Sequence, residues 1–418
     1  MMRQHNIIFD PIPFKGGSKI ATSEALALCN QSKVRFTVIT IDKAFWLNSQ
    51  LAQQHSVRII SIKAVPWLSR QVQGLFFWLN QFYFTLVLLF CLSFLAKAHR
   101  VIGASGPGVD MAIYLIQRIF KVPVVQFIHG NVACSRSIGW CLTQAQHVFY
   151  LPSTKQSLLD SLQRFYAHHY DIENDNAKND NTKHSDVEAH CVEKSTLEAN
   201  QYFQQAQFIP FINGISEQNW PSRSQTILPR CLWAASLLKW KGLEQFIEAL
   251  RTAHQQEPVF STICFIKPAQ TNLSVSTAPV PLRYTDWYRD PCEFDQIRRQ
   301  CNIFVSTSEN EPFGLSILEA LAAGMCVIIP QDGSYWDTVL TDGVNCLKYP
   351  AKDHNVLSRV ILQLHHNQQK LVAIQTKAHC FSQQYRAEQT YLNIVNTVSA
   401  DVADADSCSV LNSAKKDL

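Results

Sequence analysis

The sequence predicts an α/β protein built from two doubly wound parallel-sheet domains that face each other across a cleft. Three observations support this prediction. The chain of 418 residues is too long for one ordinary core and suits two domains. Apolar runs of strand length alternate with helical patterns in both halves. A segment at residues 210–216, PFINGIS, has the Asn-Gly pair of a turn and separates the halves.

The N-terminal domain is predicted over residues 1–210. A strand at residues 6–10 leads through a glycine-containing loop into a helix at 20–30 and a strand at 34–40, which is the order of a βαβ unit. Further strands are expected at 100–105, 123–129 and 147–152, with a helix at 111–120. This alternation is typical of a parallel sheet with helices on both faces.

The C-terminal domain is predicted over residues 211–384. Strands are expected at 231–238, 261–267, 281–287, 302–307 and 326–330, and helices at 242–250, 293–300 and 315–324. Residues 269–281, AQTNLSVSTAPVP, are too irregular for the glycine turn and helix of a complete βα unit, so this domain is expected to be trimmed there. The polar tail at 400–418 is predicted to be disordered.

Two segments depart from the α/β pattern. Residues 74–96 are apolar enough, and nearly long enough, to span a bilayer, and three alternatives remain open for them: a transmembrane helix, a buried packing helix, and a helix lying in the membrane surface. Basic residues at both ends favour surface binding over burial alone. Residues 168–200 are polar and rich in Asn and Asp, which predicts a flexible insertion loop.

Composition limits the setting in which the protein works. The 13 cysteines form no CxxC pair and mostly lie in apolar runs, which indicates a reducing compartment without a disulfide or zinc framework. The first 17 residues lack the long apolar core of a signal peptide, so export by that route is not expected. In the first 150 residues, fourteen Lys and Arg face four Asp and Glu, a net charge of +10 that favours anionic lipid or a phosphorylated acceptor over nucleic acid.

Residues 306–343 carry the most informative motif. A strand delivers the acidic loop Glu309-Asn310-Glu311 to a glycine turn that opens a helix, so the N–H groups of Phe313, Gly314 and Leu315 are expected to bind phosphate. Glu311 and Glu319 would then accept hydrogen bonds from sugar or ribose hydroxyls. Structural alternatives remain open: Ser316 and Glu319 fit a capping box, and Glu311 fits an ordinary solvated acid.

This stretch, EPFGLSILE with seven residues between Glu311 and Glu319, resembles the E-x7-E motif of glycosyltransferase family 4 (glycosyl transferases group 1), whose members have the GT-B fold. The resemblance implies that Glu311 and the amides of Phe313, Gly314 and Leu315 hold the donor sugar and diphosphate, and that Glu319 binds the ribose. It covers residues 6–398 apart from the polar insertion. It also implies that residues 385–399 form a helix returning to the N-terminal domain, which would be the acceptor side.

Other stretches resemble the same family in the expected order. Gly16-Gly17-Ser18 is similar to its N-terminal glycine loop, although a plain βα turn has the same pattern. His129, at the end of a strand, is similar to its histidine near the donor sugar, although a lone histidine is more often structural.

Lys241-Gly242 is similar to the Lys-Gly pair whose lysine neutralises the diphosphate. Family members usually carry an arginine where Ser236 stands, and we expect Lys239 to supply part of that charge without the forked geometry of arginine.

The resemblance implies a retaining glycosyltransferase that needs no metal and no cofactor beyond its donor substrate, a UDP- or GDP-sugar. The catalytic residues would be Glu311, His129 and Lys241. Peripheral contact with an anionic membrane, on the cytoplasmic side, and a glycan or lipid-linked acceptor in surface polysaccharide or lipopolysaccharide synthesis are further expectations. The alternatives are a nucleotide-sugar epimerase and a non-catalytic subunit that binds membrane or a partner transferase.

Overall fold

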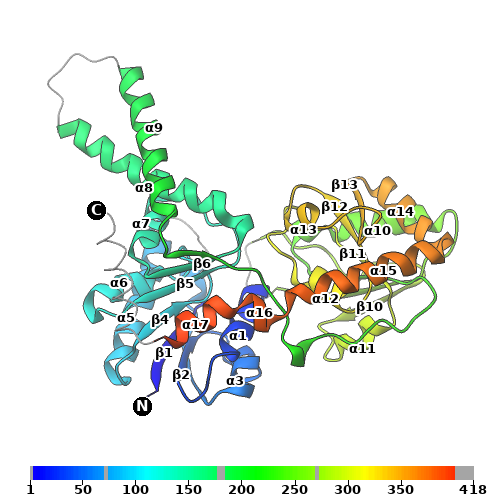
Figure 1. The fold of residues 1–418 in the computed structure, drawn as a ribbon, viewed down its shortest axis with the longest axis horizontal. Coiled ribbons are helices and arrows are strands. Elements are labelled where there is room, and N and C mark those ends of the chain that lie inside the picture. Colours follow the sequence, from blue (N-terminus) through cyan, green and yellow to red (C-terminus); the bar gives the residue numbers. More distant parts are fainter. Residues whose placement is uncertain (1–2, 70–73, 177–183, 269–272, 401–418) are drawn as a thin grey trace, which may run out of the picture. The chain divides into compact units, whose positions relative to one another are not determined.

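A computed structural model describes residues 3–69, 74–176, 184–268 and 273–400. Its contacts divide the chain into two compact units. Unit 1 comprises residues 1–212 and 391–418, and unit 2 comprises residues 213–390 (Figure 1). The tail predicted as disordered lies outside the described residues from position 401 onward.

Unit 1 is built on a seven-stranded, all-parallel sheet with the order β3-β2-β1-β4-β5-β6-β7. The strands are β1 (Gln4–Asp10), β2 (Val34–Thr40), β3 (Val57–Ser61), β4 (Arg100–Gly103), β5 (Val124–Ile128), β6 (His147–Tyr150) and β7 (Phe208–Pro210). The predicted doubly wound sheet is therefore confirmed, and β3 and β7 extend it beyond the strands expected from sequence. The chain leaves β1 in one direction and returns to pair β4 on its other side, so the switch in strand order lies between β1 and β4.

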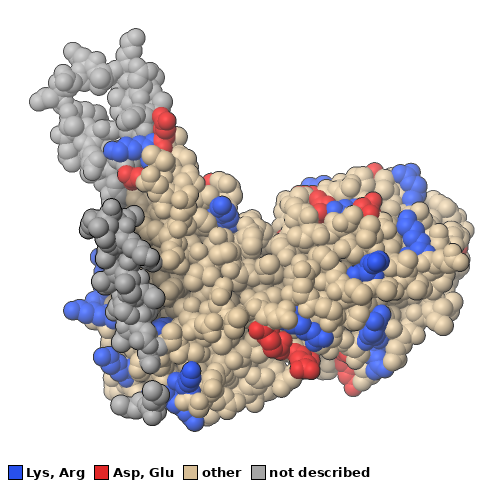
Figure 2. Space-filling view, viewed as in Figure 1, with Lys and Arg blue, Asp and Glu red and all other residues tan. Residues whose placement is uncertain are grey.

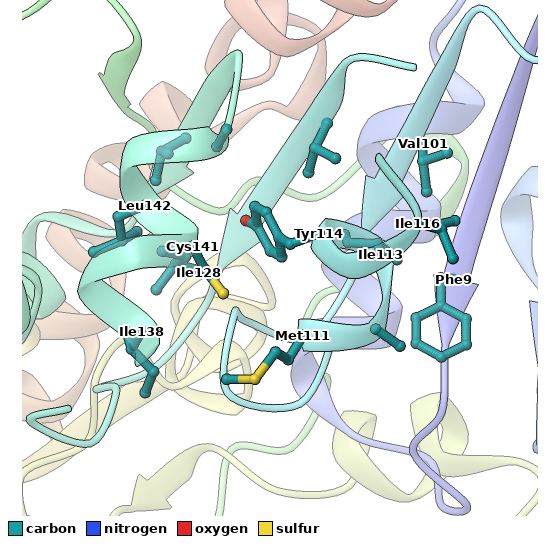
Figure 3. Packing of buried hydrophobic residues seen from close by; sticks show 14 of the residues in the cluster. Phe9, Val101, Met111, Ile113, Tyr114, Ile116, Ile128, Ile138, Cys141 and Leu142 are labelled. Atoms are coloured by element: carbon teal, nitrogen blue, oxygen red, sulfur yellow. The ribbon is translucent and has the colours of Figure 1, made fainter. Parts of the chain in front are cut away.

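Helices cover both faces of this sheet. They are α1 (Gly17–Ala27), α2 (Lys43–Leu47), α3 (Gln50–Gln54), α4 (Pro66–Ser69), α5 (Leu75–Phe94), α6 (Met111–Phe120), α7 (Arg136–Gln144), α8 (Lys155–Asn176), α9 (His184–Phe203) and α17 (Leu392–Ser399). Alternate strand residues point to opposite faces, and one set packs with α5, α6, α7 and α8. Figure 3 shows part of this core, where Tyr114 of α6 lies between Cys141 of α7 and the strands.

The last described helix, α17, belongs to unit 1 and packs against α1. Asn6 Nδ2 of β1 donates to the carbonyl of Val398, and Arg100 Nη2 of β4 donates to the carbonyl of Ala400 at 2.8 Å. Ile394 and Val398 are fully buried. These contacts fix residues 392–400 to β1 and β4, which are neighbours at the centre of the sheet.

The expected irregular loop at residues 168–200 is wrong, because most of this segment is helical. Helices α8 and α9 pack as a hairpin, with residues 177–183 outside the described part. The signal that was overlooked lies mostly in the residues that flank the segment: Leu158 and Leu162 of α8 and Ala199 and Phe203 of α9 are buried at four-residue spacing. Their packing stabilises the described parts of both helices.

Unit 2 has a six-stranded parallel sheet with the order β10-β9-β8-β11-β12-β13. The strands are β8 (Cys231–Ser236), β9 (Ser261–Ile266), β10 (Thr285–Arg289), β11 (Ile303–Val305), β12 (Cys326–Gln331) and β13 (Leu347–Pro350). The strand order reverses between β8 and β11. The loops that follow these two strands therefore leave the sheet at its switch point, where open α/β sheets bind ligands.

The helices of unit 2 are α10 (Leu243–His254), α11 (Phe294–Arg299), α12 (Leu315–Ala322), α13 (Tyr335–Val339), α14 (His354–His366), α15 (Gln368–Ser382) and α16 (Ala387–Thr390). Helices α10 and α14 pack together, as do α12 and α15. Among its described residues, the connection from β9 to β10 contains no helix. Val275, Val280 and Leu282 of this connection pack on the core in place of the missing helix, so the trimmed βα unit is confirmed for those residues.

Helix α5 is apolar on two opposite faces, of which one is buried and the other is exposed. Phe84, Leu88 and Leu92 are buried in the core of unit 1, and the rings of Phe84 and Phe9 meet edge to face at 5.7 Å. The opposite face, including Phe82, Leu86 and Phe90, is exposed. By length and composition alone this helix could cross a membrane, and the packing expected of a buried helix is found on its inner face and not on its outer face.

Candidate functional site

Two loops are joined at the switch point of unit 2. One follows β8 and contains the short 3₁₀ turn Lys239–Lys241, and the other follows β11 and carries the acidic motif. Gly242 has φ 71°, and a Cβ atom there would lie 2.2 Å from the carbonyl oxygen of Thr307. The Thr307 hydroxyl donates to the Lys241 carbonyl at 2.9 Å, and the Glu309 N–H donates to the Trp240 carbonyl at 2.8 Å. The glycine of the Lys-Gly pair therefore lets the two loops pack backbone to backbone.

This packing places Lys241 against Glu311. Their ammonium and carboxylate groups form an ion pair, and both side chains are largely buried. The ammonium nitrogen also lies 3.9 Å from the ring centroid of Trp240. An enclosed pair of this kind has few water molecules to screen it, so each charge depends on its partner.

The acidic loop enters helix α12 through Gly314. This residue has φ 77°, which glycine adopts readily, and an added Cβ would lie 3.0 Å from Glu311 Cγ and 3.1 Å from Ile317 Cδ1. No described residue accepts a hydrogen bond from the N–H groups of Phe313, Gly314 or Leu315. The ring of Phe313 is buried against Tyr335 and Trp336, so only its N–H is available to a ligand. These amides and the helix dipole make this end of α12, beside Glu311, electrostatically favourable for an anion.

Glu319 lies one turn into α12 and is held by an arginine. Its Oε2 accepts from Arg298 Nη1 of α11 at 2.7 Å, and Arg298 Nη2 pairs with Asp295 at 2.7 Å. Arg298 is buried, whereas Glu319 remains partly exposed. The capping-box alternative is wrong, because the N-cap of α12 is Gly314 rather than Ser316 and the Glu319 carboxylate bonds Arg298.

Ser236 and Lys239 complete the loop after β8. Ser236 is the last residue of β8 and is half-buried at the carboxyl edge of the sheet. Lys239 is exposed and forms an ion pair with Glu244 of α10, whose other oxygen accepts from the Ser276 hydroxyl at 2.9 Å. Its ammonium is thus engaged away from Glu311.

Sequence reasoning missed several residues that shape this site. Asp332, which follows β12, accepts from the Asn310 N–H at 2.8 Å and holds the acidic loop in place. Lys352 pairs with Glu309 at 3.2 Å. Arg298 is 21 positions from Glu319, and neither residue type nor spacing pointed to it. The sheet order, which brings the loops after β11 and β12 to one edge, could have suggested Asp332, whereas Arg298 lies on helix α11.

In unit 1, Gly16-Gly17-Ser18 lies at the corresponding switch point. Gly16 is the N-cap of α1 in an extended conformation, with φ −147°, and no atom lies within 4 Å of a Cβ added there. Neither torsion nor packing within the protein requires glycine at this position. The approach to α1 is fixed by buried Lys19, which pairs with Asp10 at 3.0 Å and donates to the Ile12 carbonyl at 2.6 Å.

His129 follows β5 and is linked to the same helix. Its Nε2 lies 3.0 Å from the hydroxyl of Thr22 on α1, and its ring is stacked on Phe127 and meets Phe211 edge to face. Nδ1 is buried and has no hydrogen-bond partner among the described residues. Burial lowers the pKa of His129 to about 3, so the imidazole is neutral at physiological pH. It therefore brings no positive charge to this end of β5.

The structure thus brings the predicted residues together in two groups. In unit 2, Lys241 and Glu311 are in direct contact beside the free amides of α12. In unit 1, Thr22 joins His129 to the helix that starts at Gly16. Among the described residues, no cluster of three His, Cys, Asp or Glu side chains could hold a metal ion.

Comparison with protein families identifies one domain. Residues 217–380 match the family model of glycosyl transferases group 1. These residues include the Lys241–Glu311 pair, the start of α12 and the Arg298–Glu319 pair. No curated protein matches the chain.

Several solved structures share the fold across nearly the whole chain. Anabaena Alr3699/HepE in complex with UDP-glucose aligns with a TM-score of 0.64 at 15% identity, covering 95% of this chain and 100% of that one. A glycosyltransferase from Rickettsia africae ESF-5 aligns with a TM-score of 0.59 at 13% identity, covering 95% of this chain and 99% of that one. The sucrose-phosphate synthase of Thermosynechococcus elongatus aligns with a TM-score of 0.59 at 15% identity, covering 95% of this chain and 98% of that one. The chain therefore has the GT-B fold of two Rossmann-like units, and residues 217–380 of unit 2 match the family model of glycosyl transferases group 1.

Proposed function

We propose that this protein is a retaining glycosyltransferase that moves a sugar from a nucleoside diphosphate donor to a glycan or lipid-linked acceptor. One observation carries the proposal: the Lys241–Glu311 pair lies beside the unpaired amides at the start of α12. A lysine and helix amides suit a diphosphate, whose negative charge grows as it leaves. A carboxylate at the same place suits the hydroxyls of the transferred sugar.

Further residues of both units have roles in this proposal. Glu319, oriented by Arg298, binds the ribose hydroxyls of the donor. Gly16, Gly17, Ser18 and the neutral His129 are the proposed ligand-binding residues of unit 1. UDP or GDP is the proposed nucleotide, and Anabaena Alr3699/HepE, a structural relative, has been crystallised with UDP-glucose. The acceptor hydroxyl attacks from the side on which the nucleotide leaves, without a metal ion.

The proposed setting is surface polysaccharide or lipopolysaccharide synthesis on the cytoplasmic face of the membrane. A lipopolysaccharide outer core galactosyltransferase, WaaB, is among the proteins that share this fold. The cationic surface of unit 1 described below suits a lipid-linked or phosphorylated acceptor.

The test is nucleotide release by the purified full chain from a panel of UDP-, GDP- and ADP-sugars, with a membrane extract as acceptor. Glu311→Gln should lower the rate by about 100-fold or more, because it removes a charge from the reacting centre. Glu309→Gln is the matched control: it lies two residues away on the same loop, is exposed and pairs with Lys352, and it should change the rate by less than about threefold.

Four results would contradict parts of the proposal. Equal rates for the Glu311 and Glu309 variants would remove the site assignment. Inversion of the anomeric centre in the product, followed by NMR, would exclude retention, and loss of activity in EDTA that Mg²⁺ restores would exclude metal independence. No release from any donor would favour the alternative, a non-catalytic subunit, with which Ser236 and the trimmed β9–β10 connection are compatible.

A further inference from the structure

The outer face of α5 is a continuous apolar surface. Phe82, Leu86, Phe90 and Phe94 are exposed at four-residue spacing and so lie in one row along the helix. Phe90 and Phe94 are 68% and 75% exposed, and the centroids of their rings lie 4.8 Å apart. The α5 face, as we call it, consists of Trp67, Leu75, Phe76, Trp78, Leu79, Phe82, Leu86, Phe90 and Phe94. Exposed apolar patches of this extent mark interaction sites.

Trp67 extends the α5 face beyond its helix. This residue belongs to α4, and its ring meets that of Phe76 edge to face at 6.0 Å. Trp67 and Trp78 therefore lie near the N-terminal end of α5, and both are exposed. Tryptophan is enriched where proteins meet the boundary between lipid and water.

The surroundings of the α5 face are cationic. Residues 43–109 contain no Asp or Glu. Tyr83 of α5 donates its hydroxyl to the carbonyl of Lys63 at 2.9 Å, and Lys97 follows the helix by three residues. Arg58 lies close enough to Cys91 of α5 to oppose the rise that burial causes in the pKa of its thiol. Arg58, Lys63 and Lys97 are all exposed.

The same segregation of charge holds over the first 150 residues. Three of the four acids, Asp10, Glu24 and Asp110, are buried, and Asp42 is half-buried and paired with Lys19. In the described part of this segment, the exposed basic side chains are Arg3, Lys15, Lys33, Arg35, Lys43, Arg58, Lys63, Lys97, Arg118, Lys121 and Arg136. In Figure 2, Lys and Arg lie on the part of unit 1 drawn below the α8–α9 hairpin. Burying the acids leaves a positive field that the composition alone understates.

A second copy of this chain is a poor occupant of the α5 face, because it would bring two positive surfaces together. A membrane rich in anionic lipid offers acyl chains to the aromatic row and negative headgroups to the lysines and arginines. A transmembrane course conflicts with the packing, since Phe84, Leu88, Cys91 and Leu92 attach α5 to the sheet core. The crossover from β3 to β4, strands of one sheet, also requires both ends of α5 to return to that sheet.

We infer that α5 lies in the plane of an anionic bilayer surface, with the α5 face among the upper acyl chains and the neighbouring Lys and Arg residues on the headgroups. At 20 residues the helix is about 30 Å long, so it provides an extended line of contact. The inference needs no donor chemistry and stands apart from the proposed reaction.

Vesicle flotation of the full chain tests the inference, with vesicles of phosphatidylcholine alone or with one third phosphatidylglycerol. Wild type should float with the anionic vesicles, and less protein should float as salt is raised. Phe90→Ser with Phe94→Ser should lower partitioning by about tenfold or more, because two exposed aromatic side chains leave the lipid. Ile227→Ser with Leu228→Ser is the matched control, since these unit 2 residues are 76% and 78% exposed, and it should float like wild type.

A second pair of variants tests the charge. Lys63→Glu with Lys97→Glu should lower partitioning into the anionic vesicles by about tenfold or more. Arg359→Glu with Lys377→Glu, at exposed positions of unit 2, should leave it unchanged.

Several outcomes would overturn the inference. Equal flotation of the Phe90/Phe94 variant and wild type would exclude the α5 face as the contact. If wild type sediments as a dimer without vesicles and the Phe90/Phe94 variant sediments as a monomer, the α5 face would be a self-association surface. Retention in membranes after alkaline carbonate extraction would indicate a span instead. Nucleotide release, measured separately without vesicles, reports on the proposed function alone.

Discussion

Lys241→Met is expected to lower glycosyl transfer by 10²- to 10³-fold, whereas Lys239→Met should change it by less than about threefold. The two lysines lie two positions apart on the same 3₁₀ turn. Lys241 is largely buried and directed at Glu311, and Lys239 is exposed and paired with Glu244. The comparison therefore holds net charge, residue type and local backbone constant while it changes one position.

The magnitude follows from the enclosure of Lys241. Two unit charges about 4 Å apart interact with about 4 kcal/mol at an effective dielectric constant of about 20. The leaving diphosphate gains only part of a charge in the transition state. Removing the Lys241 ammonium should therefore cost at most about 3–4 kcal/mol of transition-state stabilisation, equivalent to 10²- to 10³-fold in rate. For exposed Lys239, solvent screening reduces the corresponding energy to well under about 1 kcal/mol.

The assay is single-turnover transfer from the donor identified by the release panel, with kcat and KM measured separately. Lys241→Met leaves Glu311 without its partner, so Lys241→Met combined with Glu311→Gln serves to separate loss of catalysis from local rearrangement. Equal rates for the two single lysine variants would refute the reasoning, as would recovery of the wild-type rate in the double variant.

Three further predictions concern other residues of the two units. Arg298→Met should raise KM for the donor about tenfold and leave kcat within about threefold, because Arg298 positions Glu319 rather than touching the reacting atoms. Arg298→Lys should recover part of the loss, and a fall in kcat alone would contradict this role. Gly16→Ser should change the melting temperature by less than about 2 °C, since serine is a favoured N-cap and no atom lies near the new Cβ. It should lower the transfer rate at least about tenfold, because a ligand is proposed to approach this backbone. An unchanged transfer rate would mean that Gly16 belongs only to an ordinary βα turn. Burial raises the pKa of Asp110 to about 7, although hydrogen bonds from Gln126, Ser105 and Gly106 oppose the rise. The folded state therefore holds this proton more tightly than the unfolded chain does. The contribution of Asp110 to the free energy of unfolding should fall as pH rises from about 4 to 7. Asp110→Asn should remove about 2–3 kcal/mol of that fall between pH 5 and 7, measured by denaturant unfolding, and identical pH dependence in both proteins would contradict the assignment.

The sequence predicted what depends on short-range patterns. Strand and helix periodicities predicted both parallel sheets, and the E-x7-E spacing located the acidic loop and the start of α12. Partners that arise from tertiary packing were out of reach: Arg298 of helix α11 bonds Glu319 of helix α12, and Asp332 bonds Asn310 because the loops after β12 and β11 share one edge of the sheet. The α8–α9 hairpin was missed for a related reason, since its few buried residues lie at opposite ends of a polar segment.

The sidedness of α5 shows the same limit. Its sequence is apolar all round, so hydropathy could not separate a buried helix from one in the membrane surface. The sheet decides between the faces, because β1 offers Phe9 to one side of α5 and nothing covers the other among the described residues. The buried acids are equally invisible in composition, since a carboxylate counts the same whether it is exposed or enclosed.

The Lys241–Glu311 pair links the fold to the order of events in the proposed reaction. Neither charge could be enclosed alone, since an unpaired buried charge is costly. In the proposed reaction a nucleotide sugar would replace both partners at once, its phosphate meeting Lys241 and its sugar hydroxyls meeting Glu311. A nucleoside diphosphate replaces only one of them and leaves Glu311 beside a phosphate, so the product should bind less tightly than the donor and leave after transfer. Calorimetric titration of each against wild type and Glu311→Gln measures this directly: the preference for the sugar-bearing ligand should narrow in the variant, and an unchanged ratio would mean that the two charges do not exchange partners in this way.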